Sequence, residues 1–293
     1  MRPVADGAAP PPVTLLGAAR VALDDLLGAR FAAVGVPLGG FPDGPAAVRV
    51  ASQAYVAWRE AAEQTAGVRL VDYGDVAVDD ADAGGSFLRT HERLADVLAA
   101  GATPIVLGGS GITTLPVLQV LAGKLRGRLG VVAFSPSLDL GPTPGDGRES
   151  RWRRALELGV CEPRTLVLVG DRGGPADAGA RGEARSSGVR RYSLVDVAEA
   201  GIAAVAREAL ETAASGTEAV YVSVDLGVVE GGCGEPVGLR ASELAIALGV
   251  VAHGHLAAVD LCGVDRAAAW GPTPALAARL AAGVVAAAAG VDP

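Results

Sequence analysis

Several residue types are scarce in this chain of 293 residues, and each shortage excludes a class of protein. Three cysteines, Cys161, Cys233 and Cys262, lie far apart and form no Cys-x-x-Cys pair, so neither a disulfide framework nor a zinc knuckle is expected. Aromatic residues make up only 4%, so a core must be built from Val, Leu, Ile and Ala. No run approaches 18 uninterrupted apolar residues, because the Ala-rich stretch 275–289 contains Arg279 and Gly283.

Basic clusters and a targeting segment are also missing. The formal net charge is −8 and both signs are interspersed, which argues against a nucleic-acid surface. The N-terminus has one arginine followed by Pro10, Pro11 and Pro12, without the basic and apolar regions of a signal peptide. We therefore expect a cytoplasmic protein with no membrane contact.

A repeating unit organises the chain: a short apolar, β-branched run, a turn with Gly, Pro or Asp, and a longer Ala- and Leu-rich stretch. Such runs predict strands at 31–37, 68–73, 103–108, 129–134, 165–170, 219–225 and 255–261, with a further short strand at 188–192. Runs that are apolar throughout are typical of strands buried on both faces. The alternation predicts a three-layer α/β/α fold with a mostly parallel, doubly wound sheet of about eight strands.

No linker divides the chain, so residues 26–293 are expected to form a single α/β domain after an N-terminal extension over residues 1–25. Helices are predicted at 44–61, 86–100, 114–124, 151–159, 195–213, 240–252 and 274–289. The stretches 142–147 and 173–187 are interpreted as surface loops.

Ligands of such sheets bind beyond the carboxyl ends of the strands, where the βα loops converge. The residues at these positions are Gly39 and Gly40, Asp72 and Asp75, residues 108–111, residues 135–139, Asp171 and Arg172, and residues 225–227.

Seven of these segments, in order, resemble motifs of the arginase, agmatinase and formiminoglutamase (ureohydrolase) family. They are 35–49 (G-x-P…G-P-x-x-I-R), 71–76 (D-x-G-D-V), 104–112 (P-x-x-x-G-G-D-H-S), 129–140 (D-A-H-x-D), 169–173 (G-x-R-G), 221–230 (S-x-D-x-D-x-x-D-P) and 259–264 (x-D-x-x-E-x). The resemblance covers about residues 31–290 and implies the family's α/β fold.

The resemblance also implies two manganese ions that activate a bridging water, held by four Asp and two His. In this chain the His of the first ligand motif falls on Gly111, after Ser110. In the second motif the first Asp falls on Ser135, the His on Ser137 and the last Asp on Asp139. In the third motif the first Asp is retained as Asp225 and the second falls on Gly227. Only Asp139 and Asp225 remain of the six ligand positions, so no metal cofactor is expected, with a residual single Mn²⁺ as the alternative.

Other family positions are changed as well. The three histidines, His91, His253 and His255, lie outside the ligand motifs, and the stretch 141–154 lacks the family's proton-shuttling His. The Glu that would pair with a substrate guanidinium falls on Gly263.

The two retained carboxylates, Asp139 and Asp225, are the tentative catalytic residues. They could form a residual cation site or an acid–base pair. A structural role, in which each caps a helix or accepts backbone N–H bonds, is favoured. Without a cation between them the carboxylates would repel each other, and Arg172 is the candidate for that cation.

The remaining candidates are pocket-lining residues: Ser110, Gly111, Ser135, Ser137, Arg172, Gly227, Glu230 and Cys233. Residues 108–111 could cradle an anion with backbone N–H groups, although an inherited tight turn is favoured. Ser110 has no histidine base, Cys233 is favoured as an uncommitted small residue, and Glu230 as a loop residue. His253 and His255 are expected to cap a helix.

The leading functional hypothesis is a pseudoenzyme of the ureohydrolase fold that has lost manganese-dependent hydrolysis and is not a functional arginase or agmatinase. It would bind a small ligand in the old pocket or act within an oligomer. The resemblance implies trimers or hexamers of this chain, or a hetero-oligomer with an active paralogue. The alternatives are an enzyme that uses Asp139 and Asp225 without metal, and a weakened single-metal hydrolase of a guanidino or linear amidine or amide substrate.

Overall fold

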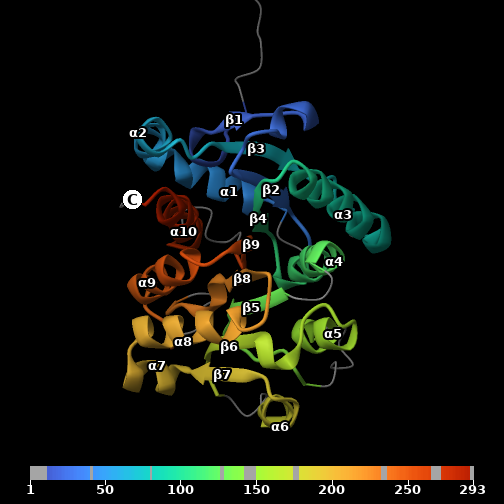
Figure 1. Ribbon diagram of the computed structural model, residues 1–293, viewed down its shortest axis with the longest axis vertical. Helices are drawn as coiled ribbons and strands as arrows, with labels where there is room; N and C mark the ends of the chain where they lie inside the picture. The colour runs from blue at the N-terminus through green and yellow to red at the C-terminus, as the bar shows by residue number, and fades with distance from the viewer. Residues whose placement is uncertain are drawn as a thin grey trace, which may run out of the picture.

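Nine parallel strands form one sheet in the computed structural model, which describes residues 12–39, 42–79, 81–125, 129–141, 150–173, 178–231, 236–264 and 272–290 (Figure 1). Their order is β1-β3-β2-β4-β9-β8-β5-β6-β7, and every neighbouring pair is parallel. The strands are β1 (Ala19–Arg20), β2 (Phe31–Val36), β3 (Leu70–Asp75), β4 (Thr103–Gly108), β5 (Leu129–Phe134), β6 (Leu166–Asp171), β7 (Arg190–Ser193), β8 (Ala219–Asp225) and β9 (Leu256–Cys262). The expected mostly parallel, doubly wound sheet is confirmed, with one strand more than the eight predicted.

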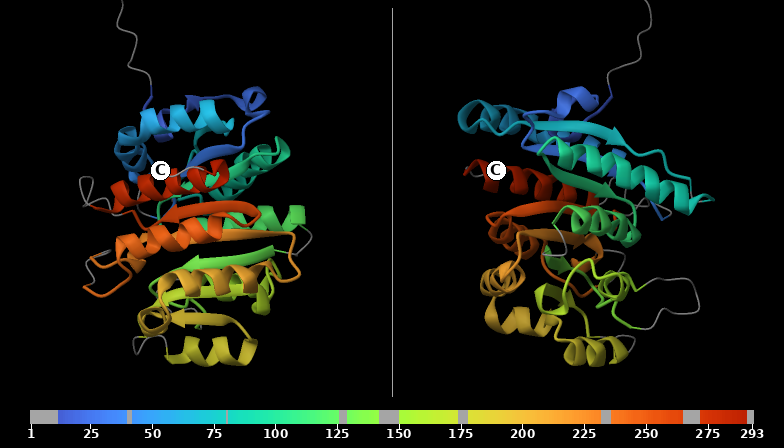
Figure 2. Two further views of the ribbon diagram at one scale, coloured as in Figure 1. Left: turned by 60° about the vertical axis from the view of Figure 1, so that its left-hand side comes forward. Right: turned by 45° about the vertical axis from the view of Figure 1, so that its right-hand side comes forward.

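Helices cover both faces of the sheet, as the two views in Figure 2 show. The helices are α1 (Gly44–Ala51), α2 (Val56–Ala66), α3 (Ala83–Ala99), α4 (Thr114–Leu125), α5 (Arg151–Glu157), α6 (Ala178–Ser187), α7 (Leu194–Ala200), α8 (Ile202–Ala214), α9 (Ala241–Ala252) and α10 (Pro272–Ala289). One core cluster packs the sheet against α1, α7, α8, α9 and α10, and the other packs it against α3, α4, α5 and α6.

The apolar runs are buried on both sides because successive residues of a strand point to opposite faces. In β5, Val132 and Phe134 belong to one core cluster, whereas Val131 and Ala133 belong to the other. Aliphatic residues fill both cores, as the low aromatic content requires. Three layers therefore follow directly from the continuous apolar runs.

Three local expectations were wrong. The predicted helix 44–61 is divided by a 3₁₀ turn over Ser52–Tyr55, and the predicted helix 195–213 is divided at Gly201, whose φ of 81° is incompatible with a helix. Residues 178–187 of the predicted loop 173–187 form α6. The predicted loop 142–147 lies outside the described residues.

The segment before residue 25 contributes to the sheet, although the proposed division at residue 25 stays a prediction. Leu15 and Leu16 are fully buried, and β1 extends the sheet beside β3. The Leu15 amide donates to Asp72 Oδ2 at 2.8 Å. Arg49 of α1 donates to the same carboxylate through Nε at 2.7 Å and Nη2 at 3.1 Å, and to Asp75 at 2.6 Å through Nη1. Two of the motifs therefore form an ion-pair cluster, with Arg49 and Asp72 buried and Asp75 half-exposed, that joins α1, β3 and the N-terminal segment.

Within the described residues, no helix combines the length and the apolar character needed to cross a membrane.

Candidate functional site

Four adjacent strands bring the predicted site residues to one edge of the sheet. Strands β4, β9, β8 and β5 are consecutive neighbours, and all are parallel. Their carboxyl ends lead into Gly109–Gly111, Gly263, residues 225–227 and residues 135–139, respectively. Segments that are far apart in the sequence therefore meet where parallel α/β sheets bind ligands.

Arg151, which the sequence analysis did not select, lies at the centre of this edge. It is the first residue of α5, and its side chain is 6% exposed. Its Nε donates to Asp139 Oδ2 at 2.6 Å, and its Nη2 donates to Asp225 Oδ2 at 3.0 Å. The same Nη2 donates to Ser135 Oγ at 2.9 Å. One guanidinium thus joins both carboxylates, Asp139 and Asp225, and a serine at a position that the family resemblance assigns to a metal ligand.

The backbone conformation after β5 places the Asp139 side chain next to the guanidinium of Arg151. Asp139 has a φ of 44°, in the left-handed region that aspartate tolerates better than most residues. Its carboxylate also accepts a hydrogen bond from Ser137 Oγ at 2.7 Å, and its carbonyl accepts the amide of Arg153 at 3.2 Å. The serine and the first turn of α5 therefore hold this strained residue in place.

Glycine at position 111 makes room for the guanidinium. A Cβ atom built on Gly111 would lie 2.2 Å from Arg151 Nη1 and 2.8 Å from Arg151 Cζ. A similar restriction applies at Gly263, where a Cβ atom would lie 2.6 Å from Asp225 Oδ1 and the φ is 73°. A side chain at either position would disturb the ion-paired cluster.

The charge of Arg151 is stabilised by its two partners. Burial by itself lowers the pKa of this guanidinium, but the carboxylates of Asp139 and Asp225 outweigh it and raise the pKa well above its usual value. Arg151 is therefore a permanent cation, held between two carboxylates that would otherwise face each other without a counter-charge.

Asp225 also accepts a backbone N–H bond, which is the structural role that the sequence analysis favoured for it. Its Oδ1 accepts the amide of Gly227 at 2.9 Å, which caps the 3₁₀ turn over Leu226–Val228, while its Oδ2 faces Arg151. One carboxylate thus anchors the loop after β8 and pairs with the guanidinium.

Arg172, the candidate for the neutralising cation, is bonded to neither Asp139 nor Asp225 within the residues that the structure describes. Arg172 donates through Nε to the carbonyl of Val237 at 2.7 Å and through Nη2 to the carbonyl of Gly227 at 2.5 Å. The cation paired with Asp139 and Asp225 in the described part of the chain is Arg151. Arg172 instead joins two loops at the same edge of the sheet.

The other candidates have ordinary structural positions. In the segment 108–111, the amide of Gly109 donates to Val36 O at 3.1 Å and that of Ser110 to Leu38 O at 2.9 Å, so these two amides are not free to cradle an anion. Glu230 is exposed, and its amide donates to the carbonyl of Leu239. Cys233 lies outside the described residues.

Two of the three histidines, His253 and His255, form backbone contacts near the opposite ends of the strands. His253 follows the last turn of α9, and its Nδ1 lies 2.6 Å from the carbonyl of Gly249. The Nδ1 of His255 lies 2.9 Å from the carbonyl of Glu218. The contact of His253 agrees with the helix-capping role that we expected, whereas His255 contacts Glu218, which lies outside the described helices, so the same expectation for His255 was wrong.

Asp260, a buried carboxylate beneath the site, was not selected as a site residue by the sequence analysis. Asp260 of β9 is fully buried and accepts hydrogen bonds from Tyr221, from Ser223 at 2.8 Å and from Thr114 at 3.0 Å. Burial raises the pKa of Asp260, although these donors oppose the increase. The network connects β8, β9 and the start of α4 directly below the loops that carry the site.

The residues present do not fit the family's manganese pair. Two divalent cations require several anionic oxygens with imidazole nitrogens. Among the residues that the structure describes, no group of three or more His, Cys, Asp or Glu side chains could hold a metal ion. The two carboxylates that face the site are bonded to Arg151, whose positive charge would repel a metal ion.

The buried cysteines give a prediction for thiol reactivity. Burial raises the pKa of Cys161 to about 12. Burial and the charges of Asp225 and Asp260 raise the pKa of Cys262 well above its usual value, although Arg151 opposes this. At pH 8 only about one Cys161 thiol in 10⁴ would be ionised.

In a Cys233→Ser background, we expect no alkylation of either cysteine by iodoacetamide in the folded protein and complete alkylation in guanidinium chloride. Rapid labelling of the folded protein by mass spectrometry would contradict the burial of these thiols.

Comparison with known proteins identifies a family relationship over almost the whole chain. The model of the arginase family matches residues 25–287. Guanidinopropionase from Pseudomonas aeruginosa is 32% identical over 167 residues, which are 56% of this chain and 51% of that protein. Formimidoylglutamase from Halalkalibacterium halodurans is 28% identical over 214 residues, which are 70% of this chain and 66% of that protein. The aligned region thus spans half to two thirds of these curated relatives.

Solved structures share the fold at lower sequence identity. Formimidoylglutamase from Bacillus subtilis superimposes with a TM-score of 0.85, at 22% identity, and covers 100% of this chain and 98% of that one. Proclavaminate amidino hydrolase from Streptomyces clavuligerus gives a TM-score of 0.78 at 22% identity, over 96% and 98% of the two chains. These similarities establish the fold.

Proposed function

This chain belongs to the arginase family, and from that premise we propose that it is a pseudoenzyme in which Arg151 has replaced the metal ions. Its pocket would serve binding or assembly, without metal-dependent hydrolysis of guanidino or formimino compounds. The relatives whose printed names describe such hydrolyses define the chemistry that we propose this chain has lost.

One observation carries the proposal: the guanidinium of Arg151 bridges Asp139 and Asp225, at 2.6 Å and 3.0 Å. These are the two carboxylates that the family resemblance assigns to metal binding. A manganese ion would have to displace a buried cation that also donates to Ser135. Leaving that cation in place beside a divalent ion would be unfavourable at such short range.

The substitutions around Arg151 support the same conclusion, because they complement one another. Gly111 leaves the volume that the guanidinium needs, and Ser135 supplies a neutral acceptor to one of its nitrogens. Ser137 donates to the other oxygen of Asp139. A site that had merely lost its ligands would not be expected to have Gly111 and Ser135 fitted to the arginine and Ser137 bonded to its partner Asp139.

The alternative of metal-independent acid–base catalysis has weaker support. A catalytic carboxylate must exchange a proton with substrate, yet Asp139 and Asp225 are each already hydrogen-bonded to Arg151 and to a second donor. The single-metal hydrolase has the same difficulty. Both alternatives would require Arg151 to leave its two partners.

Assembly with an active paralogue and self-association into trimers or hexamers stay predictions, as does a small-molecule ligand of the pocket. An inactive family member can still contribute an interface to an oligomer, because the interface depends on the fold and not on the metal ligands.

The proposal is tested by loading the purified protein with Mn²⁺ and measuring its metal content and its hydrolytic activity. We expect no stoichiometric metal after desalting, and no release of urea, ammonia or formamide from guanidino and formimino substrates. An active family member treated in parallel serves as the positive control. Two tightly bound ions per chain, or turnover that depends on Mn²⁺, would refute the pseudoenzyme.

A further inference from the structure

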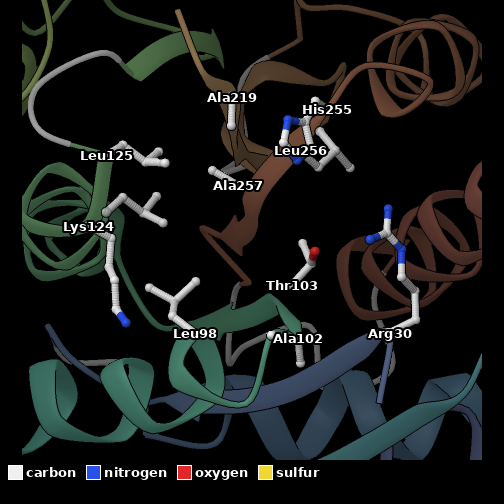
Figure 3. A pocket seen from close by; sticks show the side chains of 12 residues that line it. Arg30, Leu98, Ala102, Thr103, Lys124, Leu125, Ala219, His255, Leu256 and Ala257 are labelled. Atoms are coloured by element: carbon white, nitrogen blue, oxygen red, sulfur yellow. The ribbon is translucent and has the colours of Figure 1, made fainter. Parts of the chain in front are cut away.

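A cavity lies at the other end of the strands, away from Arg151 (Figure 3). Its volume is about 310 Å³, at the lower end of the usual range for small-molecule sites. Thr103, Ala219 and Leu256 begin β4, β8 and β9, so this cavity opens at the amino edge of the same strands whose carboxyl ends carry the Arg151 cluster. The cavity is therefore separate from the Arg151 site.

The walls of the cavity combine an apolar surface with positive charge. Apolar side chains come from α3, α4 and β9, among them Leu98, Leu121 and Ala257. Arg30 and Lys124 lie on opposite sides in Figure 3, and none of the described lining residues is acidic. Neither Arg30 nor Lys124 forms an ion pair with any described carboxylate, although Arg30 lies over the ring of Phe31 at 5.7 Å.

Thr103 provides the observation that distinguishes this cavity from a chance gathering of surface cations. Thr103 is only 6% exposed, and its hydroxyl points into the cavity on the side of Arg30, whereas Lys124 lies on the opposite wall beyond Leu98 (Figure 3). The hydroxyl forms no hydrogen bond with any described residue. A polar group this deeply placed lacks bulk water on most sides, so a ligand oxygen would complete its bonding.

We propose that this cavity binds a small organic acid, with its carboxylate between Arg30 and the Thr103 hydroxyl, its apolar body against the leucines, and Lys124 adding positive charge from the opposite wall. The chain carries a net charge of −8, so its overall field opposes an anion and the attraction must come from these two local cations. An apolar body is required because aliphatic side chains line most of the interior. A neutral or cationic ligand would leave Arg30 and Lys124 without a counter-charge.

Titration calorimetry with hexanoate tests this assignment, with 1-hexanol as the neutral analogue. We expect one hexanoate site per chain, with an affinity that falls as salt is added. In Arg30→Gln/Lys124→Gln, binding should weaken at least about tenfold, and in Thr103→Val about threefold or more. Arg164→Gln changes an exposed arginine outside the cavity and should bind as the unmodified protein does. Absence of hexanoate binding up to about 10 mM, equal binding of 1-hexanol, or unchanged affinity in the double variant would overturn the proposal.

The two sites can be separated experimentally. Arg151 lies at the opposite edge of the sheet, so Mn²⁺ content and hydrolysis assays do not depend on hexanoate. Failure of the calorimetric experiment would leave the pseudoenzyme proposal untouched, and the reverse also holds.

Discussion

Replacement of Arg151 by methionine is expected to lower the free energy of unfolding by about 2–4 kcal/mol. Methionine keeps much of the apolar stem but removes the charge, which leaves Asp139 and Asp225 without a counter-charge. Their side chains are 28% and 18% exposed, so solvent relieves part of the cost, and we place the effect below that of a fully buried pair. Urea denaturation followed by circular dichroism measures the change.

Two further variants separate the charge effect from general damage to α5. Arg153→Met removes a neighbouring arginine that is 40% exposed and pairs with Glu157, and it should cost less than about 1 kcal/mol. In Arg151→Met/Asp139→Asn/Asp225→Asn the unpaired charges are gone, so at least half of the lost stability should return. If Arg151→Met and Arg153→Met were equally mild, the ion-paired cluster would not be a significant source of stability.

Gly111→Ala is expected to destabilise the protein by about 1–3 kcal/mol through contact with Arg151. The added Cβ would lie 2.2 Å from Nη1, and the guanidinium cannot move away without weakening its bonds to Asp139 and Asp225. In an Arg151→Met background the obstacle is removed, and the same alanine should cost less than about 0.5 kcal/mol. The difference between the two backgrounds measures the coupling between positions 111 and 151.

Gly123→Ala is the matched control for this cycle. Gly123 lies in α4, and a Cβ atom built there has nothing within 4 Å. Alanine should therefore leave stability unchanged or raise it by up to about 1 kcal/mol. Equal costs of Gly111→Ala with and without Arg151 would show that the glycine is not retained for the arginine.

The order and placement of the buried strands were predictable because their signal is local. Continuous apolar runs such as 103–108 and 129–134 can be buried only between two layers of helices. Helix interruptions were harder to predict. The division at Gly201 depends on a positive φ that a single glycine permits without requiring it. Strand β1 has only two residues, both exposed, so it carries no apolar pattern that sequence reasoning could detect.

At the site, the sequence predicted which residues occupy the family's ligand positions, but it did not identify Arg151 as the cation that pairs with them. Motif order predicted that Gly111, Ser135, Ser137, Asp139, Asp225 and Gly227 occur where the family has ligands, and it predicted that two carboxylates need a cation. It selected Arg172 because that residue directly follows a strand. Arg151 begins a helix with three arginines in four residues, and this pattern does not distinguish a buried arginine from its exposed neighbours.

A contact over 74 residues, such as that between Arg151 and Asp225, depends on the register of strands and the docking of α5. The spacing of residues in the sequence gives neither the strand register nor the position of α5 on the sheet. The sequence does contain one signal, the large apolar Trp152 next to Arg151, which favours a core-facing start of α5. Trp152 is fully buried in the structure. An arginine next to such a residue, in a chain with two stranded carboxylates, was the better candidate for their counter-ion.

The most direct test of the account is a crystal structure of the protein grown with excess Mn²⁺ and measured at a wavelength where manganese scatters anomalously. We predict that the Arg151 guanidinium lies between Asp139 and Asp225 and that this region contains no anomalous peak. A manganese peak between the two carboxylates, with Arg151 displaced from them, would contradict the claim that the arginine has replaced the metal.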